Sequence, residues 1–128
     1  MTTITDDGLE WKAGALVGNH DAIDAVAVGS GTGNEGTDAT SLASQEYKAL
    51  TSSEDVVVQE TNSLGQYEAI ITVTGDQEVP AGTQISEIGV FGGADSGEDV
   101  LVVIDEFADV EVEQGHTEEF TVTMTETK

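Results

Sequence analysis

The excess of acid over base limits this chain more than any other feature of its sequence. Its 128 residues include 26 aspartates and glutamates against three lysines and no arginine, and the formal net charge at pH 7 is −23. In dilute buffer such self-repulsion opposes a compact fold. In molar salt the Debye length falls to about 3 Å, and most of the repulsion is screened. We therefore expect a folded chain of this kind to work among high concentrations of salt cations.

An acidic chain can also be disordered, but disordered chains lack apolar segments. This one contains Val56-Val57-Val58 and the aliphatic run 100–104, and 38% of its residues are hydrophobic. A single domain of this length can bury about two thirds of its unfolded surface. The sequence thus favours an ordered protein from a salt-accumulating cell, with a core mostly of valine, isoleucine, leucine and alanine.

The same composition excludes several partners. Lys12, Lys48 and Lys128 form no basic stripe that could neutralise phosphates, so we expect no nucleic-acid binding. Anionic membranes would repel the chain, and no apolar run approaches the roughly 20 residues of a membrane span. Residues 1–7 lack the basic and apolar regions of a signal peptide. Cysteine is absent, which removes disulfides and thiolate chemistry. The prediction is a protein made in the cytoplasm, with no cofactor and no membrane partner.

Turn chemistry and alternation favour strands over helices. Fifteen glycines are spread through the chain, with a single proline. In the last apolar segment Phe120, Val122 and Met124 fall on one face of a strand and threonines on the other. Strands are expected at 22–28, 54–61, 66–74, 84–91, 99–108 and 117–125. The fold class is therefore all-β, an antiparallel β-sandwich of about six to eight strands with at most one short helix.

The first 20 residues differ from the rest. Residues 1–20 are expected to form a loosely structured N-terminal arm or lead-in, and residues 21–128 a single β-sandwich domain. The short helix, if present, is expected at 38–47, where Asp38 or Thr40 could cap it. The arm carries Trp11, Leu16 and Val17 as its only sizeable apolar anchors. We expect assembly through this apolar surface and through strand edges, because oligomers cover edges that are a hazard in a monomer.

Candidate sites for chemistry have little support in the sequence. The glycine-rich run 29–36 lacks the Gly-Lys-Ser/Thr ending of a phosphate loop and predicts a flexible turn. His20 beside Asp21 could form a catalytic dyad, but nothing nominates a nucleophile or an oxyanion site. His20 and His116 are interpreted as surface residues. We expect no enzymatic activity, and the competing idea of a hydrolase with paired carboxylates gains nothing from pairs in a chain rich in acid.

Acidic clusters raise the question of a cation site. Asp109, Glu111 and Glu113 would share one strand face, and they are the candidate metal ligands. The acids of the loop 95–99 lack the spacing of an EF-hand. Because acid is abundant everywhere, chance proximity is common, and we interpret these groups as solvated, with no specific metal.

The order of the motifs carries a resemblance. A strand ending in Gly29-Ser30-Gly31 is followed by Thr40-Ser41-Leu42 and Glu46-Tyr47-Lys48, then by Glu87-Ile88-Gly89-Val90-Phe91, the aliphatic strand 100–104 and the threonine-rich strand 120–125. This order resembles a family of small tail-associated proteins of tailed viruses, over about residues 22–125. The segment 87–91 is the most specific part. Relatives tend to carry an arginine near positions 46–48, where this chain has Lys48.

The resemblance implies a non-enzymatic structural protein of the tail, fibre or baseplate, and it implies no catalytic residues. With the acidic composition, it predicts a virion component of a haloarchaeal tailed virus, assembled in the host cytoplasm. Its partners would be copies of itself, in a symmetric oligomer, and other virion proteins. A capsid decoration or turret is an equally open place in the particle.

A receptor- or glycan-binding β domain is the alternative function. Its aromatic platform would come from Trp11, Tyr47 and Tyr67. Within the segment 87–91, Gly89 is expected to mark a bulge or a close backbone approach. Glu87 is expected to be solvated, with an ion pair to Lys48 as the other possibility.

The interpretation of the acidic clusters can be tested by calorimetry. Isothermal titration of the protein with Ca²⁺ in high KCl should show no binding heat, because scattered solvated carboxylates do not form a coordination cage. A saturable heat with one ion per chain would instead establish a specific site.

Overall fold

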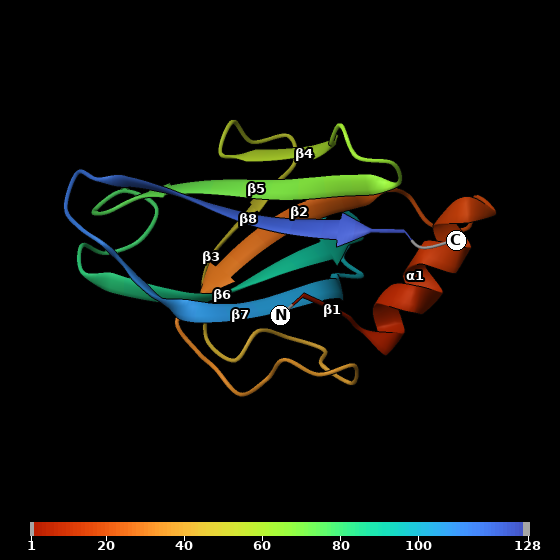
Figure 1. The fold of residues 1–128 in the computed structure, drawn as a ribbon, viewed down its shortest axis with the longest axis horizontal. Helices are drawn as coiled ribbons and strands as arrows, with labels where there is room; N and C mark the ends of the chain where they lie inside the picture. The colour runs from red at the N-terminus through yellow and green to blue at the C-terminus, as the bar shows by residue number, and fades with distance from the viewer. Residues whose placement is uncertain (1, 127–128) are drawn as a thin grey trace.

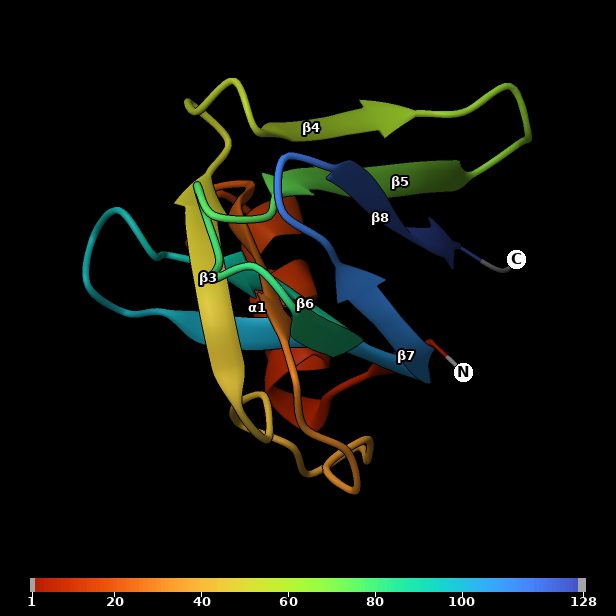
Figure 2. The ribbon, with the colours of Figure 1, turned by 90° about the vertical axis from the view of Figure 1, so that its left-hand side faces the viewer.

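Two antiparallel sheets lie face to face in the computed structural model, which describes residues 2–126 (Figure 1). The elements in chain order are β1 (Thr3–Ile4), α1 (Asp6–Leu16), β2 (Ile23–Gly29), β3 (Gln45–Leu50), β4 (Val56–Glu60), β5 (Gln66–Thr74), β6 (Thr83–Gly92), β7 (Val100–Val112) and β8 (Thr117–Thr125). The larger sheet has the order β1-β7-β6-β2-β3 and the smaller β4-β5-β8. Figure 2 looks along the sandwich, with α1 behind the larger sheet. The predicted all-β antiparallel sandwich with at most one helix is confirmed.

Strict alternation builds the core between the sheets. On β8, Phe120, Val122 and Met124 are buried and the intervening residues are exposed. In the register of β5 and β8, Ile71 pairs with Phe120 and Ala69 with Val122, so one face of the small sheet is continuously apolar. This face packs on valines and isoleucines of β2 and β6. Each such side chain contributes roughly 1.5–3 kcal/mol when fully buried.

A second apolar layer covers the outer face of the larger sheet. Ala25, Phe91, Leu101 and Ile104 are buried there, together with Leu42 from the long segment 30–44. That segment, orange to yellow in Figures 1 and 2, runs along the outer side of the sheet. Strand β6 is consequently buried on both faces from Ile85 onward, even at the polar residues Ser86 and Glu87.

Glu87 is fully buried beneath this segment. Its Oε2 accepts hydrogen bonds from the backbone N–H groups of Gly31 at 3.0 Å and Ser44 at 2.8 Å, and its Oε1 from that of Ala43 at 2.8 Å. Hydrogen bonds to an ionised acceptor are among the strongest in proteins. Three of them fasten both ends of the segment 30–44 to β6.

Both expectations for Glu87 are therefore wrong: it is neither solvated nor paired with Lys48. The Lys48 ammonium lies 3.7 Å from the centroid of the Phe91 ring and forms an ion pair with Asp99. Gly89 marks a close approach of side chains: a Cβ there would lie 2.9 Å from Leu101 and from Leu42.

The helix is not where the sequence analysis placed it. Within 38–47, residues 38–44 form turns and bends, and β3 begins at Gln45. The segment is pulled out of helical geometry because Glu87 binds two of its N–H groups and Leu42 is buried on the sheet.

The expectation of a loosely structured arm is also wrong, because the helix lies inside it. Thr5 caps α1, accepting the N–H of Gly8 at 2.8 Å, and Asp6 and Asp7 in the first turn favour the positive end of the helix dipole. Residues 3–4 add β1 to the edge of the larger sheet, beside β7. Residues 3–16 are thus an ordered part of the structure.

Replacing Glu87 tests the buried carboxylate. Glu87→Ala leaves three backbone N–H groups without their acceptor and should lower the free energy of unfolding by about 3 kcal/mol, measured by urea titration in molar KCl. Glu119→Ala removes the same charge from an exposed position on β8 and should change stability by less than about 0.5 kcal/mol. Equal effects of the two variants would contradict the assignment.

Candidate functional site

Trp11 anchors α1 at one end of the sandwich, where cavities open beside it. Its side chain is 5% exposed, and its ring stacks on His20 with the centroids 4.1 Å apart and the planes at 10°. The indole lies so close to Gly92 that a Cβ there would collide with it. Trp11 is therefore mostly buried in the core, and it can take the assembly role expected for it only through the walls of the cavities beside it.

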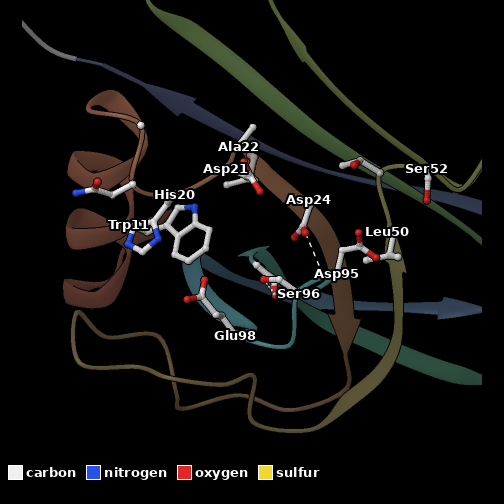
Figure 3. Close-up of a pocket in the computed structure, with 15 residues that line it drawn as sticks. Trp11, His20, Asp21, Ala22, Asp24, Leu50, Ser52, Asp95, Ser96 and Glu98 are labelled. Carbon is white, nitrogen blue, oxygen red and sulfur yellow. Dashed lines mark hydrogen bonds between the residues drawn. The ribbon is translucent and has the colours of Figure 1, made fainter.

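A polar pocket of about 470 Å³ opens on one side of Trp11 (Figure 3). It is lined by residues 18–24, the turn at 50–52 and the β6–β7 connection. Asp24 is directed toward that connection, and its two carboxylate oxygens accept the N–H groups of Ala94 at 3.0 Å and Asp95 at 3.1 Å. Its role is to hold the turn, so the most central carboxylate of the pocket is already satisfied.

The acids of this pocket and of β7 do not form a metal centre. Within residues 2–126 no three histidine, aspartate or glutamate side chains lie close enough together to hold a metal ion. Of the candidate ligands, Asp109, Glu111 and Glu113 are all exposed. Glu113 instead meets His116, its Oε2 lying 3.2 Å from the imidazole Nδ1 at an exposed position. His116 is a surface residue, as predicted, whereas His20 is half-buried on Trp11.

An apolar groove of about 440 Å³ opens on the other side of α1. We call it the α1 groove. Its apolar lining comes from α1, β2, β5 and β7. The residues are Trp11, Ala15, Leu16, Ile23, Tyr67 and Val102. Its charged residues, Lys12 and Glu126, form an ion pair with each other. The Tyr67 hydroxyl donates to Glu126 at 3.2 Å, and burial, reinforced by this carboxylate, raises the pKa of Tyr67.

The outer face of α1 exposes apolar side chains beside the exposed acids Asp6 and Glu10. Leu9, Ala13, Leu16 and Val17 are spaced so that they share one side of the helix and its last turn. Leu9 is 52% exposed, Leu16 79% and Val17 73%. We call these four residues the α1 stripe. The structure therefore separates the three residues expected on one surface: Leu16 and Val17 face solvent, and Trp11 lies beneath them in the core.

Leu9 was missed by the sequence analysis. The signal was available, because Thr5 followed by two aspartates is a helix start, and a helix from residue 6 places Leu9 and Leu16 two turns apart on one face. A loosely structured arm has no helical face, so the prediction of an arm does not single out Leu9.

The aromatic residues expected to form a glycan platform do not come together. Trp11 is buried and Tyr67 lines the α1 groove, whereas Tyr47 lies on β3 and donates its hydroxyl to Asp55 at 2.8 Å. Burial, followed by this hydrogen bond, raises the pKa of Tyr47 to about 12. The three rings therefore offer a sugar no common stacking surface.

No protein-family model matches the chain, and no curated protein is significantly similar to it. In residues 2–126, no helix is both long and apolar enough to cross a membrane. The function must therefore be argued from the surface itself.

Two substitutions test whether Trp11 stabilises the fold while Leu16 does not. Trp11→Ala should lower the free energy of unfolding by about 3–5 kcal/mol, because it empties a packed site between α1 and the sheets. Leu16→Ala, at a side chain 79% exposed, should change it by less than about 0.5 kcal/mol. Urea titrations in molar KCl at dilute protein concentration would measure both. A small effect of Trp11→Ala would mean that α1 does not depend on this anchor.

Proposed function

We propose that the chain is a non-enzymatic structural protein that forms a homo-oligomer through the α1 end of its sandwich. The observation that carries this proposal is the α1 stripe, a set of exposed apolar side chains beside an apolar groove on a molecule of net charge −23. Contiguous exposed apolar surface on a soluble protein commonly marks a contact with another macromolecule. Such surface is costly to leave in water, and association removes the cost.

Electrostatics favours this end of the molecule as the contact. Residues 11–20 contain Lys12 and no acid, whereas acids are spread over the rest of the chain. The first two turns of α1 carry Asp6, Asp7 and Glu10, so only the C-terminal half of the helix, where Leu16 lies, can meet a second copy without bringing acids together. Molar salt screens the remaining repulsion and leaves the apolar attraction in place.

Strand edges are the weaker contact. The outer residues of β8 are threonines and glutamates, and acidic side chains on an edge oppose pairing with another negatively charged copy. At the other edge of the small sheet, β4 has five residues and a single exposed valine of note, Val57 at 45%. On the larger sheet, β1 has only two residues. Compared with the edges at β8, β4 and β1, the helix offers the larger apolar contact.

We place this oligomer in the virion of a haloarchaeal tailed virus, in the tail, fibre or baseplate, or as a capsid decoration or turret. Two arguments support the placement: the resemblance of the motif order to tail-associated proteins, and an acid content suited to molar salt. Other virion proteins would be its remaining partners. A rigid β-sandwich that presents one adhesive end is suited to repeated assembly, because the contact does not require the body of the protein to change shape.

Light scattering during size-exclusion chromatography in molar KCl tests the proposal. The wild-type chain should elute as a discrete oligomer, and Leu16→Glu should shift it to the monomer mass because a carboxylate would enter the apolar contact. Val57→Glu, on the β4 edge, is the matched control and should leave the oligomer intact. A wild-type monomer at all accessible concentrations would reject the proposal and turn attention to the glycan-binding alternative.

A further inference from the structure

The α1 groove is shaped to accept an apolar side chain. Trp11, Ile23, Tyr67 and Val102 contribute to its walls, and Leu16 stands at its margin with most of its side chain in solvent. Lys12 and Glu126 neutralise each other there. The groove therefore offers apolar surface without net charge.

A matching side chain is displayed on the hairpin that joins β4 to β5. Leu64 is 86% exposed, more than any other large hydrophobic side chain that the structure describes. Figure 2 shows this connection projecting beyond the other strands. No charged residue occurs between Glu60 and Glu68, so the tip is neutral, and Leu64 is the one aliphatic side chain among its polar neighbours.

The tip is held in a defined shape. The N–H of Thr61 donates to the carbonyl of Gln66 at 3.0 Å, and the N–H of Gln66 donates to that of Ser63 at 3.2 Å. Gly65 has a φ of 68°, a left-handed conformation that suits glycine in a tight turn. A preorganised tip loses less conformational entropy on binding than a flexible loop would.

We propose that the α1 groove binds Leu64 of a second copy of this chain. The inference rests on the proposed function and names the contact within it. Leu64 does not fill its own groove, since it is exposed in the single chain. Neither surface carries a net charge, so this contact avoids the repulsion expected between two copies of a chain of net charge −23.

Hairpin and groove lie at the same end of the molecule. The N–H of Glu126 donates to the carbonyl of Gly65 at 2.8 Å, and the side chain of Glu126 lines the groove. Tyr67, three residues after Leu64, lines it too. This placement fits a two-fold contact in which each copy inserts its Leu64 into the groove of the other, as an isologous interface requires.

Disulfide trapping between two single-cysteine variants tests the contact, because the natural chain contains no cysteine. Full-length Leu64→Cys and Leu16→Cys proteins are mixed in molar KCl and oxidised, and covalent heterodimers are quantified by mass spectrometry. We expect a high yield from this pair. The matched mixture of Leu64→Cys with Val57→Cys, whose positions are both exposed, should give at least about tenfold less.

Sedimentation equilibrium supplies the second measurement. Leu64→Ser, at an exposed tip, should leave the fold intact and raise the dissociation constant of the self-contact about 100-fold. Equal trapping yields, or a Leu64→Ser protein that associates like wild type, would overturn the inference while the proposed function stands. A monomeric wild-type chain would overturn both.

Discussion

The carboxylate of Glu87 joins the most buried strand of the larger sheet to the segment that covers it, through three backbone N–H groups. With 26 acids and three lysines, ion pairs cannot neutralise the carboxylates of this chain, and backbone donors take the place of cations. The same solution recurs in the loops: Asp24 accepts from residues 94 and 95, Glu106 from residues 33 and 34, and Glu78 from residue 74. Acid thus fixes the connections of the fold, in addition to covering its surface.

The α1 end depends on one of these contacts. Asp24 holds the turn that follows β6, the preceding Gly92 gives the indole of Trp11 room to pack, and Trp11 fixes α1 against the sheets. A helix held in this way can leave Leu16 and Val17 in solvent without losing its position. The exposed stripe is therefore a stable feature of the folded monomer and does not result from a loosely attached terminus.

The sequence predicts those parts of the fold that depend on neighbouring residues, and it does not predict those that depend on contacts between distant segments. The strands Gln66–Thr74 and Thr117–Thr125 were predicted with the bounds that the structure shows. One face of each strand is packed in the core and the other faces solvent, so apolar and polar residues alternate along the sequence. The helix was misplaced because cap residues occur before both segments, and only tertiary contacts decide between them. Glu87 was missed for a related reason: its donors are backbone groups of a distant loop, which leave no mark in the sequence. That Trp11 is buried and Leu16 exposed likewise depends on which face of α1 packs on the sheet.

The position of Gly29 beside the Glu87 carboxylate limits how either residue can change in evolution. A methyl group at Gly29 would collide with the Glu87 carboxylate and with the carbonyl of Ser44. A lineage that acquires a side chain at position 29 must therefore displace Glu87, and a lineage that first shortens Glu87 leaves three backbone N–H groups without their acceptor. Neither order of substitution passes through a well-folded intermediate. Among descendants of this chain, the glycine and the glutamate should be inherited together, even where the acids of the outer surface drift freely.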